Sequence, residues 1–143
     1  EVDGVDYVFL SAEDFDNLRE AGGFLEWAEF AGNCYGTPAA PVTDRISRGV
    51  DVILEIDLQG VRQVRANLPA ARTVFISPPS IDALGSRLAS RGTEDPAAIE
   101  RRLAAAQDEL AAAGEFDCVI VNDDVEVAAN QLLAWVHNPA NEH

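Results

Sequence analysis

Val52-Ile53-Leu54-Glu55-Ile56-Asp57-Leu58-Gln59-Gly60 is the stretch of sequence that decides the fold. Its first five residues have the aliphatic, β-branched composition of a strand, and apolar residues follow at helical spacing at Val61, Val64 and Leu68. A second strand-like run covers residues 73–76. Strand, helix and strand in succession predict an α/β fold with a parallel sheet.

The same alternation continues toward the end of the chain. Ser80 predicts the start of one helix, and Asp95-Pro96 predicts the start of another, with proline at its first position. The apolar run 118–121 is typical of a strand covered on both faces, and a last helix is expected from about Asp123.

Upstream of residue 50 the pattern differs. Ser11-x-x-Asp14 predicts a helix start, residues 33–37 read as a turn, and residues 24–30 alternate as a strand. That strand places Glu26 on a largely apolar face. A carboxylate in such a place needs a donor partner, because its burial without one costs several kcal/mol.

Charge and composition exclude several functions. The 143 residues are 24% charged and carry a formal charge of −15, which disfavours binding to nucleic acid or to anionic membranes. Cys34 and Cys118 lack the spacing of zinc ligands, so no metal site is expected. No apolar run approaches the about 20 residues of a membrane span, and no signal peptide is visible, so we expect a cytoplasmic protein.

Several polar residues stand where ligands bind in parallel sheets, just after the strands. Asp57 and Asn122 occupy such positions, although Asp57 could equally cap the next helix. Arg87 and Arg91 share one helix face, and Arg102 follows a short loop. These arginines could clamp phosphate, but surface ion pairs with the many carboxylates are an alternative interpretation.

Seven strings in this order together resemble the guanylate kinase family: G4-V-D-Y-V-F9, F24-L-E-W27, G32-N-C-Y-G-T37, L54-E-I-D-L-Q-G60, P78-P-S80, R91-G-T-E94 and V121-N-D-D124. The resemblance runs from about residue 4 to residue 136. It implies an α/β fold, a P-loop kinase-like parallel sheet core with a small GMP-binding lobe (1–49) and a lid at about 88–104 within the core (50–143). It also implies the transfer of the γ-phosphoryl group of ATP to GMP, with Mg²⁺ accompanying ATP.

The resemblance also implies roles for individual residues. Glu26 and Asp57 would accept hydrogen bonds from N1 and N2 of guanine, and the Thr37 hydroxyl would face O6. Tyr7 and Tyr35 would contact the GMP phosphate. The remaining expected site residues serve the transferred phosphoryl group, namely Arg91, Arg102 and Arg87, or the adenine end of ATP, namely Asn122.

The sequence departs from the family at its start. It has no Lys and no G-x-x-x-x-G-K-[ST] string, so the P-loop strand is missing. We therefore expect the strand at 52–56 and the strand at 73–77 to have unpaired edges. The polypeptide alone would then be poorly folded or self-associated, and it would have no kinase activity.

A second class of function fits part of the pattern. Catalytically inactive guanylate-kinase-like domains bind phosphorylated protein partners in the former GMP site, but they typically lose the I-D-x-Q-G carboxylate and the R-G-T arginine. Both are retained here, at Asp57 and Arg91, which favours the enzyme. The expected partners are therefore GMP and ATP, and not nucleic acid or a membrane. A kinase for another monophosphate is disfavoured by the paired acceptors Glu26 and Asp57.

Overall fold

The structure is a computed structural model that describes residues 7–92 and 95–138. By its contacts the chain divides into two compact units, Glu1–Ala71 and Arg72–His143. The predicted division into functional lobes at residue 49 stays a prediction, whereas the first compact unit extends to Ala71. Residues 4–6 of the first string, and Thr93 and Glu94 of the lid string, lie outside the described residues.

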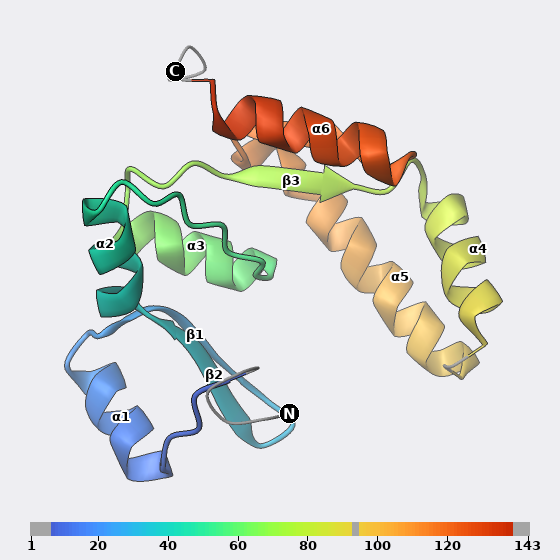
Figure 1. Cartoon of the computed structure of the whole chain (residues 1–143). Coiled ribbons are helices and arrows are strands. Elements are labelled where there is room, and N and C mark those ends of the chain that lie inside the picture. The colour runs from blue at the N-terminus through green and yellow to red at the C-terminus, as the bar shows by residue number, and fades with distance from the viewer. Residues whose placement is uncertain (1–6, 93–94, 139–143) are drawn as a thin grey trace. The chain divides into compact units, whose positions relative to one another are not determined.

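The first unit combines a two-stranded antiparallel sheet with three helices (Figure 1). The elements are α1 (Ala12–Glu20), β1 (Phe24–Phe30), β2 (Asn33–Pro38), α2 (Ala39–Ser47) and α3 (Leu58–Asn67). Two predicted helix starts are confirmed by their caps. Ser11 Oγ accepts from the Asp14 amide, and Asp57 Oδ1 accepts from the Gly60 amide.

The prediction that residues 33–37 form a turn is wrong, because they form most of β2. The turn is the two residues Ala31 and Gly32, whose φ angles are 52° and 79°, as the tight hairpin turns that match strand twist require. Gly36 serves close packing inside β2, since a Cβ there would lie 2.8 Å from the Phe24 ring. Turn-forming residue types therefore concealed a strand.

Leu25, Val42 and Val64 form one core cluster of the first unit, and Phe15 and Phe24 are buried next to each other, with ring centroids 4.6 Å apart. Against the cluster of Leu25 packs the segment 51–57, which contributes Val52, Leu54 and Ile56 while alternate side chains are exposed. The predicted strand at 52–56 is wrong as a hydrogen-bonded element, because this extended segment has no strand partner among the described residues. Its period-two burial is nevertheless that of a strand.

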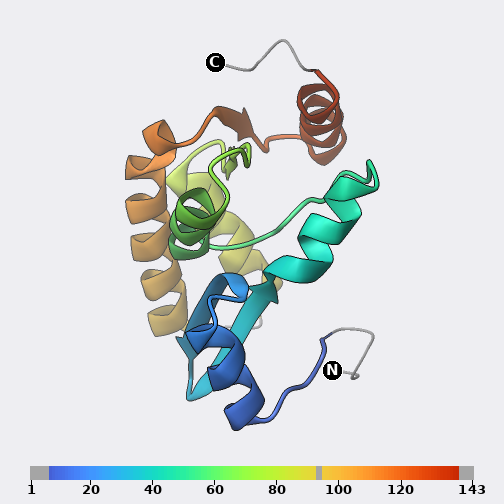
Figure 2. The same cartoon turned by 90° about the vertical axis from the view of Figure 1, so that its left-hand side faces the viewer.

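The second unit contains β3 (Val74–Ser77), α4 (Ile81–Arg91), α5 (Pro96–Ala111), the 3₁₀ turn η1 (Ala113–Glu115), β4 (Cys118–Val121) and α6 (Val125–Val136). The caps expected at Ser80 and Asp95 are present, and Pro96 begins α5. Helices α4 and α5 pack against each other, with Leu103 beside Gly85 (Figures 1 and 2).

Strands β3 and β4 pair in parallel, which confirms the predicted sheet type. Phe75 and Ile120 are both buried, on opposite faces of this pair, because the register sets Phe75 beside Val119 and Ile120 beside Ile76. The expectation that residues 118–121 are covered on both faces is wrong for this unit, because Val119 and Val121 are about half exposed, at 49% and 50%.

Candidate functional site

Glu26 lies in the middle of β1 and is half-buried. Its partner across the sheet is Thr37 in β2, and the Thr37 hydroxyl donates to Glu26 Oε1 at 2.7 Å. The donor that the apolar face requires is therefore supplied by the neighbouring strand. Oε2 of Glu26 accepts no hydrogen bond among the described residues.

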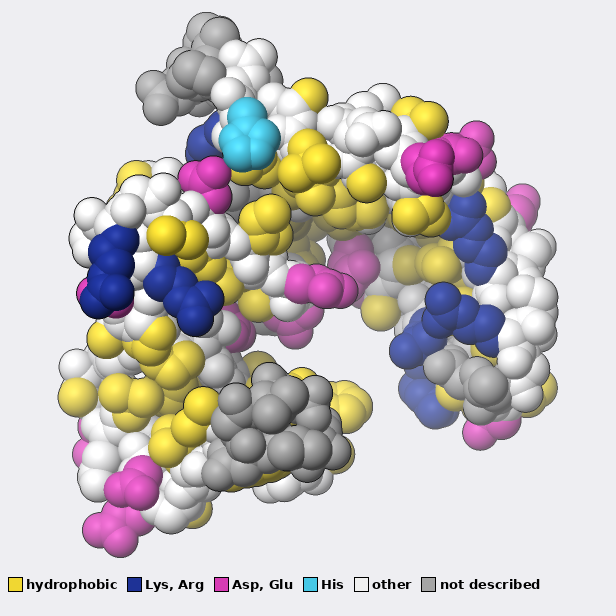
Figure 3. Space-filling model, viewed as in Figure 1, with side chains coloured by type: hydrophobic (Ala, Val, Ile, Leu, Met, Phe, Trp, Pro, Cys, Tyr) yellow, Lys and Arg dark blue, Asp and Glu magenta, His cyan; other side chains and the backbone are white. Residues whose placement is uncertain are grey.

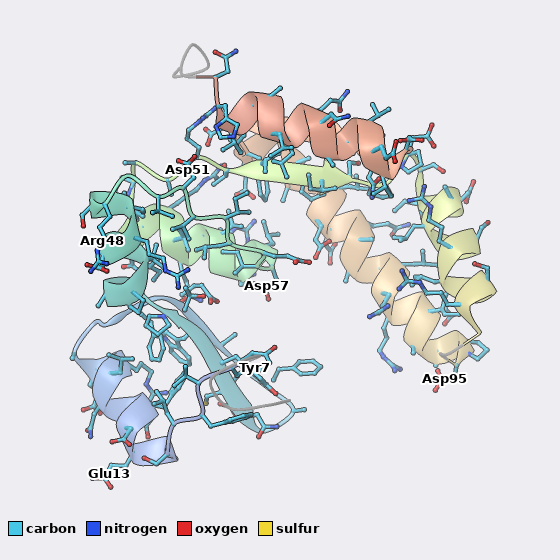
Figure 4. All side chains as sticks on the ribbon, viewed as in Figure 1. Tyr7, Glu13, Arg48, Asp51, Asp57 and Asp95 are labelled. Carbon is cyan, nitrogen blue, oxygen red and sulfur yellow. The ribbon has the colours of Figure 1, made fainter. Side chains whose placement is uncertain are left out.

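Asp57 stands at the amino end of α3 and caps it. Its Oδ1 accepts from the Gly60 amide at 2.7 Å, so one of the two alternatives considered for Asp57, a capping role, is present. A carboxylate has two oxygens, and Oδ2 has no hydrogen-bond partner in the described part of the chain. Asp57 is exposed and is labelled at the start of α3 in Figure 4. The cap therefore leaves one oxygen for a ligand.

The two carboxylates converge at Gly60. A Cβ placed on this glycine would lie 3.2 Å from Asp57 Oδ1 and 3.2 Å from Glu26 Oε2, so the two oxygens are no farther apart than twice that distance. Glu26 and Asp57 thus come from different segments and reach the first turn of one helix. The positive end of the helix dipole favours negative charge at this place. Two acceptors so close together can bind the donor edge of one small ligand.

Two tyrosines lie together in the same unit. The rings of Tyr7 and Tyr35 meet edge to face, with their centroids 6.0 Å apart, and both side chains are partly exposed, at 48% and 38%. Tyr35 lies in β2, two residues before Thr37. Figure 4 labels Tyr7 beside the β1–β2 hairpin. The site predicted for the GMP phosphate therefore has two phenols in contact at the surface.

Sequence reasoning missed two polar residues that touch the strand of Glu26. Gln63 Oε1 accepts from the Trp27 amide at 3.0 Å, and Gln63 Nε2 donates to the Trp27 carbonyl at 2.9 Å. Asn67 Nδ2 donates to the Leu25 carbonyl at 2.9 Å. Both side chains come from α3, and their spacing of four places them on one helix face. That spacing is the only signal of them in the sequence.

Arginine side chains gather over α4 and α5 in the second unit (Figure 3). Arg91 is the last residue of α4, and Arg102 lies in the second turn of α5; both are exposed. Arg87 donates to the backbone carbonyls of Asn122 and Asp123 at 3.2 and 3.4 Å. Within residues 7–92 and 95–138, Arg87 and Arg91 form no ion pair. The alternative of surface ion pairs is therefore not realised at these two residues.

Asn122 follows β4 and ends the strand ladder, since its amide donates to the Ser77 carbonyl at 2.7 Å. Its side-chain oxygen is buried and has no hydrogen-bond partner within residues 7–92 and 95–138. A buried acceptor without a partner is costly, so it marks a place where a ligand N–H would be stabilising.

The predicted site residues fall into two groups. The first unit holds Tyr7, Glu26, Tyr35, Thr37 and Asp57, and the second unit holds Arg87, Arg91, Arg102 and Asn122. The described residues contain no cluster of three or more His, Cys, Asp or Glu side chains that could hold a metal ion. None of the helices in this part of the chain is long and apolar enough to cross a membrane.

An α/β fold with two converging carboxylates in one unit, and exposed arginines in the other, is compatible with an enzyme that transfers phosphoryl groups between nucleotides. Comparison with known proteins gives the particular family. The family model "Guanylate kinase" matches residues 1–138, and the chain belongs to the guanylate kinase family.

Individual relatives agree. The chain is 56% identical over 132 residues to the guanylate kinase of Synechococcus sp. (strain CC9311), covering 92% of this chain and 70% of that protein. It is 59% identical over 131 residues to the guanylate kinase of Streptomyces coelicolor, covering 92% and 66%. Among solved structures, the guanylate kinase from Anaplasma phagocytophilum matches with a TM-score of 0.70 and 32% identity, covering 99% of this chain and 71% of that chain. The fold class expected from the sequence is thereby confirmed.

Proposed function

We propose that the protein is a guanylate kinase, a transferase that moves the γ-phosphoryl group of ATP to GMP and releases ADP and GDP. The observation that carries the proposal is the convergence of Glu26 and Asp57 on the first turn of α3. Membership of the guanylate kinase family supports it independently.

The two carboxylates select guanine by the direction of their hydrogen bonds. Guanine presents donors at N1 and at its 2-amino group, and Glu26 Oε2 and Asp57 Oδ2 are acceptors without partners among the described residues. Adenine has an acceptor at N1 and no 2-amino group, so it would leave both carboxylates unpaired. A site of this kind can reject the wrong base by roughly 10⁴-fold.

The tyrosine pair binds the other end of GMP in this proposal. The phenol groups of Tyr7 and Tyr35 would donate hydrogen bonds to phosphate oxygens, and the contact between the two rings holds both phenols at the same surface. The hydroxyl of Thr37 holds Glu26 in the structure, at 2.7 Å. Its contact with guanine O6 stays a prediction.

The second unit supplies charge for the transfer itself. Arg91, Arg102 and Arg87 would neutralise the charge that develops on the transferring phosphoryl group. Asn122 would accept a hydrogen bond from the amino group of adenine, which supplies the missing partner of its side-chain oxygen. Mg²⁺ would arrive with ATP as part of the substrate in this proposal.

Two further expectations belong to this proposal. A cytoplasmic location stays a prediction, and so does the absence of kinase activity in the 143-residue polypeptide by itself. The alternative, a non-catalytic domain that binds phosphorylated proteins, is disfavoured because Asp57 and Arg91 are both retained.

The test is a kinase assay with ATP and GMP on the protein expressed from its complete reading frame and on its Glu26→Gln variant. The readouts are the amounts of ADP and GDP formed and the KM values for GMP and ATP. We expect ADP and GDP to form in equal amounts, and the KM for GMP to rise strongly in Glu26→Gln while the KM for ATP is unchanged. A protein that forms no GDP, or a Glu26→Gln variant with an unaltered KM for GMP, would contradict the proposal.

A further inference from the structure

The free edge of β1 is covered by amide side chains instead of by another strand. The strand register pairs residues 26–30 of β1 with residues 33–37 of β2, and the backbone groups of Leu25 and Trp27 bond to side chains of α3. Gln63 binds both the N–H and the carbonyl of Trp27, as a residue of a neighbouring strand would do. Asn67 binds the carbonyl of Leu25. We call Gln63 and Asn67 together the amide clamp.

The spacing of the clamp fits the strand. Four residues along an α-helix rise about 6 Å, and two residues along a strand advance nearly 7 Å. Asn67 can therefore reach Leu25 at the same time as Gln63 reaches Trp27. Because the later helix residue bonds to the earlier strand residue, α3 and β1 run in opposite directions. A shift of either element by one residue would lose all three hydrogen bonds.

The residue between the two clamped positions is Glu26. Its neighbours on both sides are held by α3, while its own side chain is held by Thr37 at 2.7 Å. Asp57 caps that same helix through the Gly60 amide. One rigid helix thus carries Asp57 at its end and grips the strand of Glu26 along its side.

Apolar packing alone would not fix this arrangement. Leu25 and Val64 meet in the core, but hydrophobic contacts are not directional and tolerate sliding. Hydrogen bonds of 2.9 to 3.0 Å require a definite register. The spacing between the two carboxylates therefore depends on the clamp.

We propose that Gln63 and Asn67 are positioning residues for guanine recognition, which set the distance between Glu26 and Asp57 by locking β1 to α3. The proposal rests on the proposed function, because it assumes that these two carboxylates read the base. The clamp residues touch the strand and not the substrate, so they act through Glu26.

Steady-state kinetics on the protein expressed from its complete reading frame test the proposal, with Gln63→Ala and Asn67→Ala compared with Val42→Ala. Val42 lies in the same core but on α2, so its variant loses stability without touching the clamp. We expect Gln63→Ala to raise the KM for GMP roughly tenfold or more, as misplacement of a binding group by part of an ångström does. The KM for ATP should not change, and the preference for GMP over IMP, which lacks the 2-amino group, should fall.

A double-mutant cycle with Glu26→Gln shows whether Gln63 acts through Glu26. The effect of Gln63→Ala on the KM for GMP should largely disappear in the Glu26→Gln background, since groups that act as a unit are not additive. Should Gln63→Ala fail to fold, the same cycle is carried out with Asn67, which is exposed and whose side chain makes one hydrogen bond among the described residues.

Each outcome has a distinct meaning. If Gln63→Ala and Asn67→Ala only lower the melting temperature, as Val42→Ala does, and leave the KM for GMP and the GMP preference unchanged, the clamp is structural and the inference is overturned. If Glu26→Gln itself leaves the KM for GMP unchanged, the proposed function fails, and the inference falls with it.

Discussion

The hydroxyl of Thr37 donates its only proton to the carboxylate of Glu26, across a strand pair and at 2.7 Å. The bond fixes Oε1 of Glu26 and leaves Oε2 at the first turn of α3, next to the carboxylate of Asp57. The same proton cannot also be donated to guanine O6. In the structure Thr37 therefore holds the carboxylate of Glu26, and any donation to O6 needs the hydroxyl to turn.

Replacing Thr37 by Val keeps the shape of the side chain and removes the hydroxyl. We expect the KM for GMP to rise roughly tenfold, because a hydrogen bond to a charged group contributes about 1.5–3 kcal/mol. Thr43→Val is the matched control, since the Thr43 hydroxyl donates only to carbonyls of its own helix, those of Ala39 and Ala40. Steady-state assays that found the same KM in both variants would refute a positioning role for Thr37.

The absence of a side chain at Gly60 leaves room for both carboxylates. In Gly60→Ala the new Cβ would lie 3.2 Å from Glu26 Oε2 and from Asp57 Oδ1, tighter than ordinary contact, so at least one carboxylate must move. We expect a higher KM for GMP and an unchanged KM for ATP.

Gly85→Ala provides the control for Gly60→Ala. Gly85 also lies inside a helix, but a Cβ there would meet Leu103 at an ordinary 3.7 Å. Alanine should therefore stabilise α4 by up to about 1 kcal/mol, measured by thermal unfolding, without any effect on GMP. If both glycine variants bound GMP as the unsubstituted protein does, Gly60 would have no role in the site.

Asp57 caps α3 and is proposed to bind guanine, and substitution can separate these two roles. Asparagine caps helices about as well as aspartate, so Asp57→Asn should change the free energy of unfolding by less than about 0.5 kcal/mol while raising the KM for GMP strongly. Asp124→Ala removes the cap of α6 in the other unit, and it should cost about 1 kcal/mol of stability with no change in the KM for GMP. An Asp57→Asn variant with an unaltered KM would leave Asp57 as a cap and nothing more.

Substitution of Arg91 tests the proposed role of the arginines in phosphoryl transfer. Arg91→Ala should lower kcat by roughly 100-fold or more with little change in the KM for GMP, because the proposed role of the arginine is to stabilise charge that develops only during transfer. Arg48 is the control, since it forms an exposed ion pair with Asp44 at 3.2 Å, and its replacement by Ala should be nearly silent. Equal kcat values in Arg91→Ala and Arg48→Ala would exclude Arg91 from catalysis.

Much of the fold could be predicted because its signals are local. The caps at Ser11, Ser80 and Asp95 and the proline at the start of α5 each follow from a few neighbouring residues. β2 was missed because its residue types favour turns, whereas its strand conformation depends on pairing with β1. The segment 51–57 has the burial pattern of a strand, but a strand also needs a partner, and periodicity carries no information about one.

Some residues of the candidate site could likewise be predicted from local sequence, and others depend on the fold. The position of Glu26 on an apolar face and of Asp57 after an apolar run could be predicted from the sequence, and so could the need for a donor to Glu26. The identity of that donor, Thr37, could not, because it depends on strand register. Gln63 and Asn67 were missed because their partners are 36 and 42 residues away and leave no local pattern.

The preference for guanine over adenine tests the central claim most directly. The measurement is kcat/KM for GMP and for AMP, with ATP as the phosphoryl donor, on the protein expressed from its complete reading frame. If Glu26 and Asp57 bind the donor edge of the base as proposed, the preference for GMP is roughly 10⁴-fold. Equal values for the two nucleotides would contradict guanine recognition by these carboxylates.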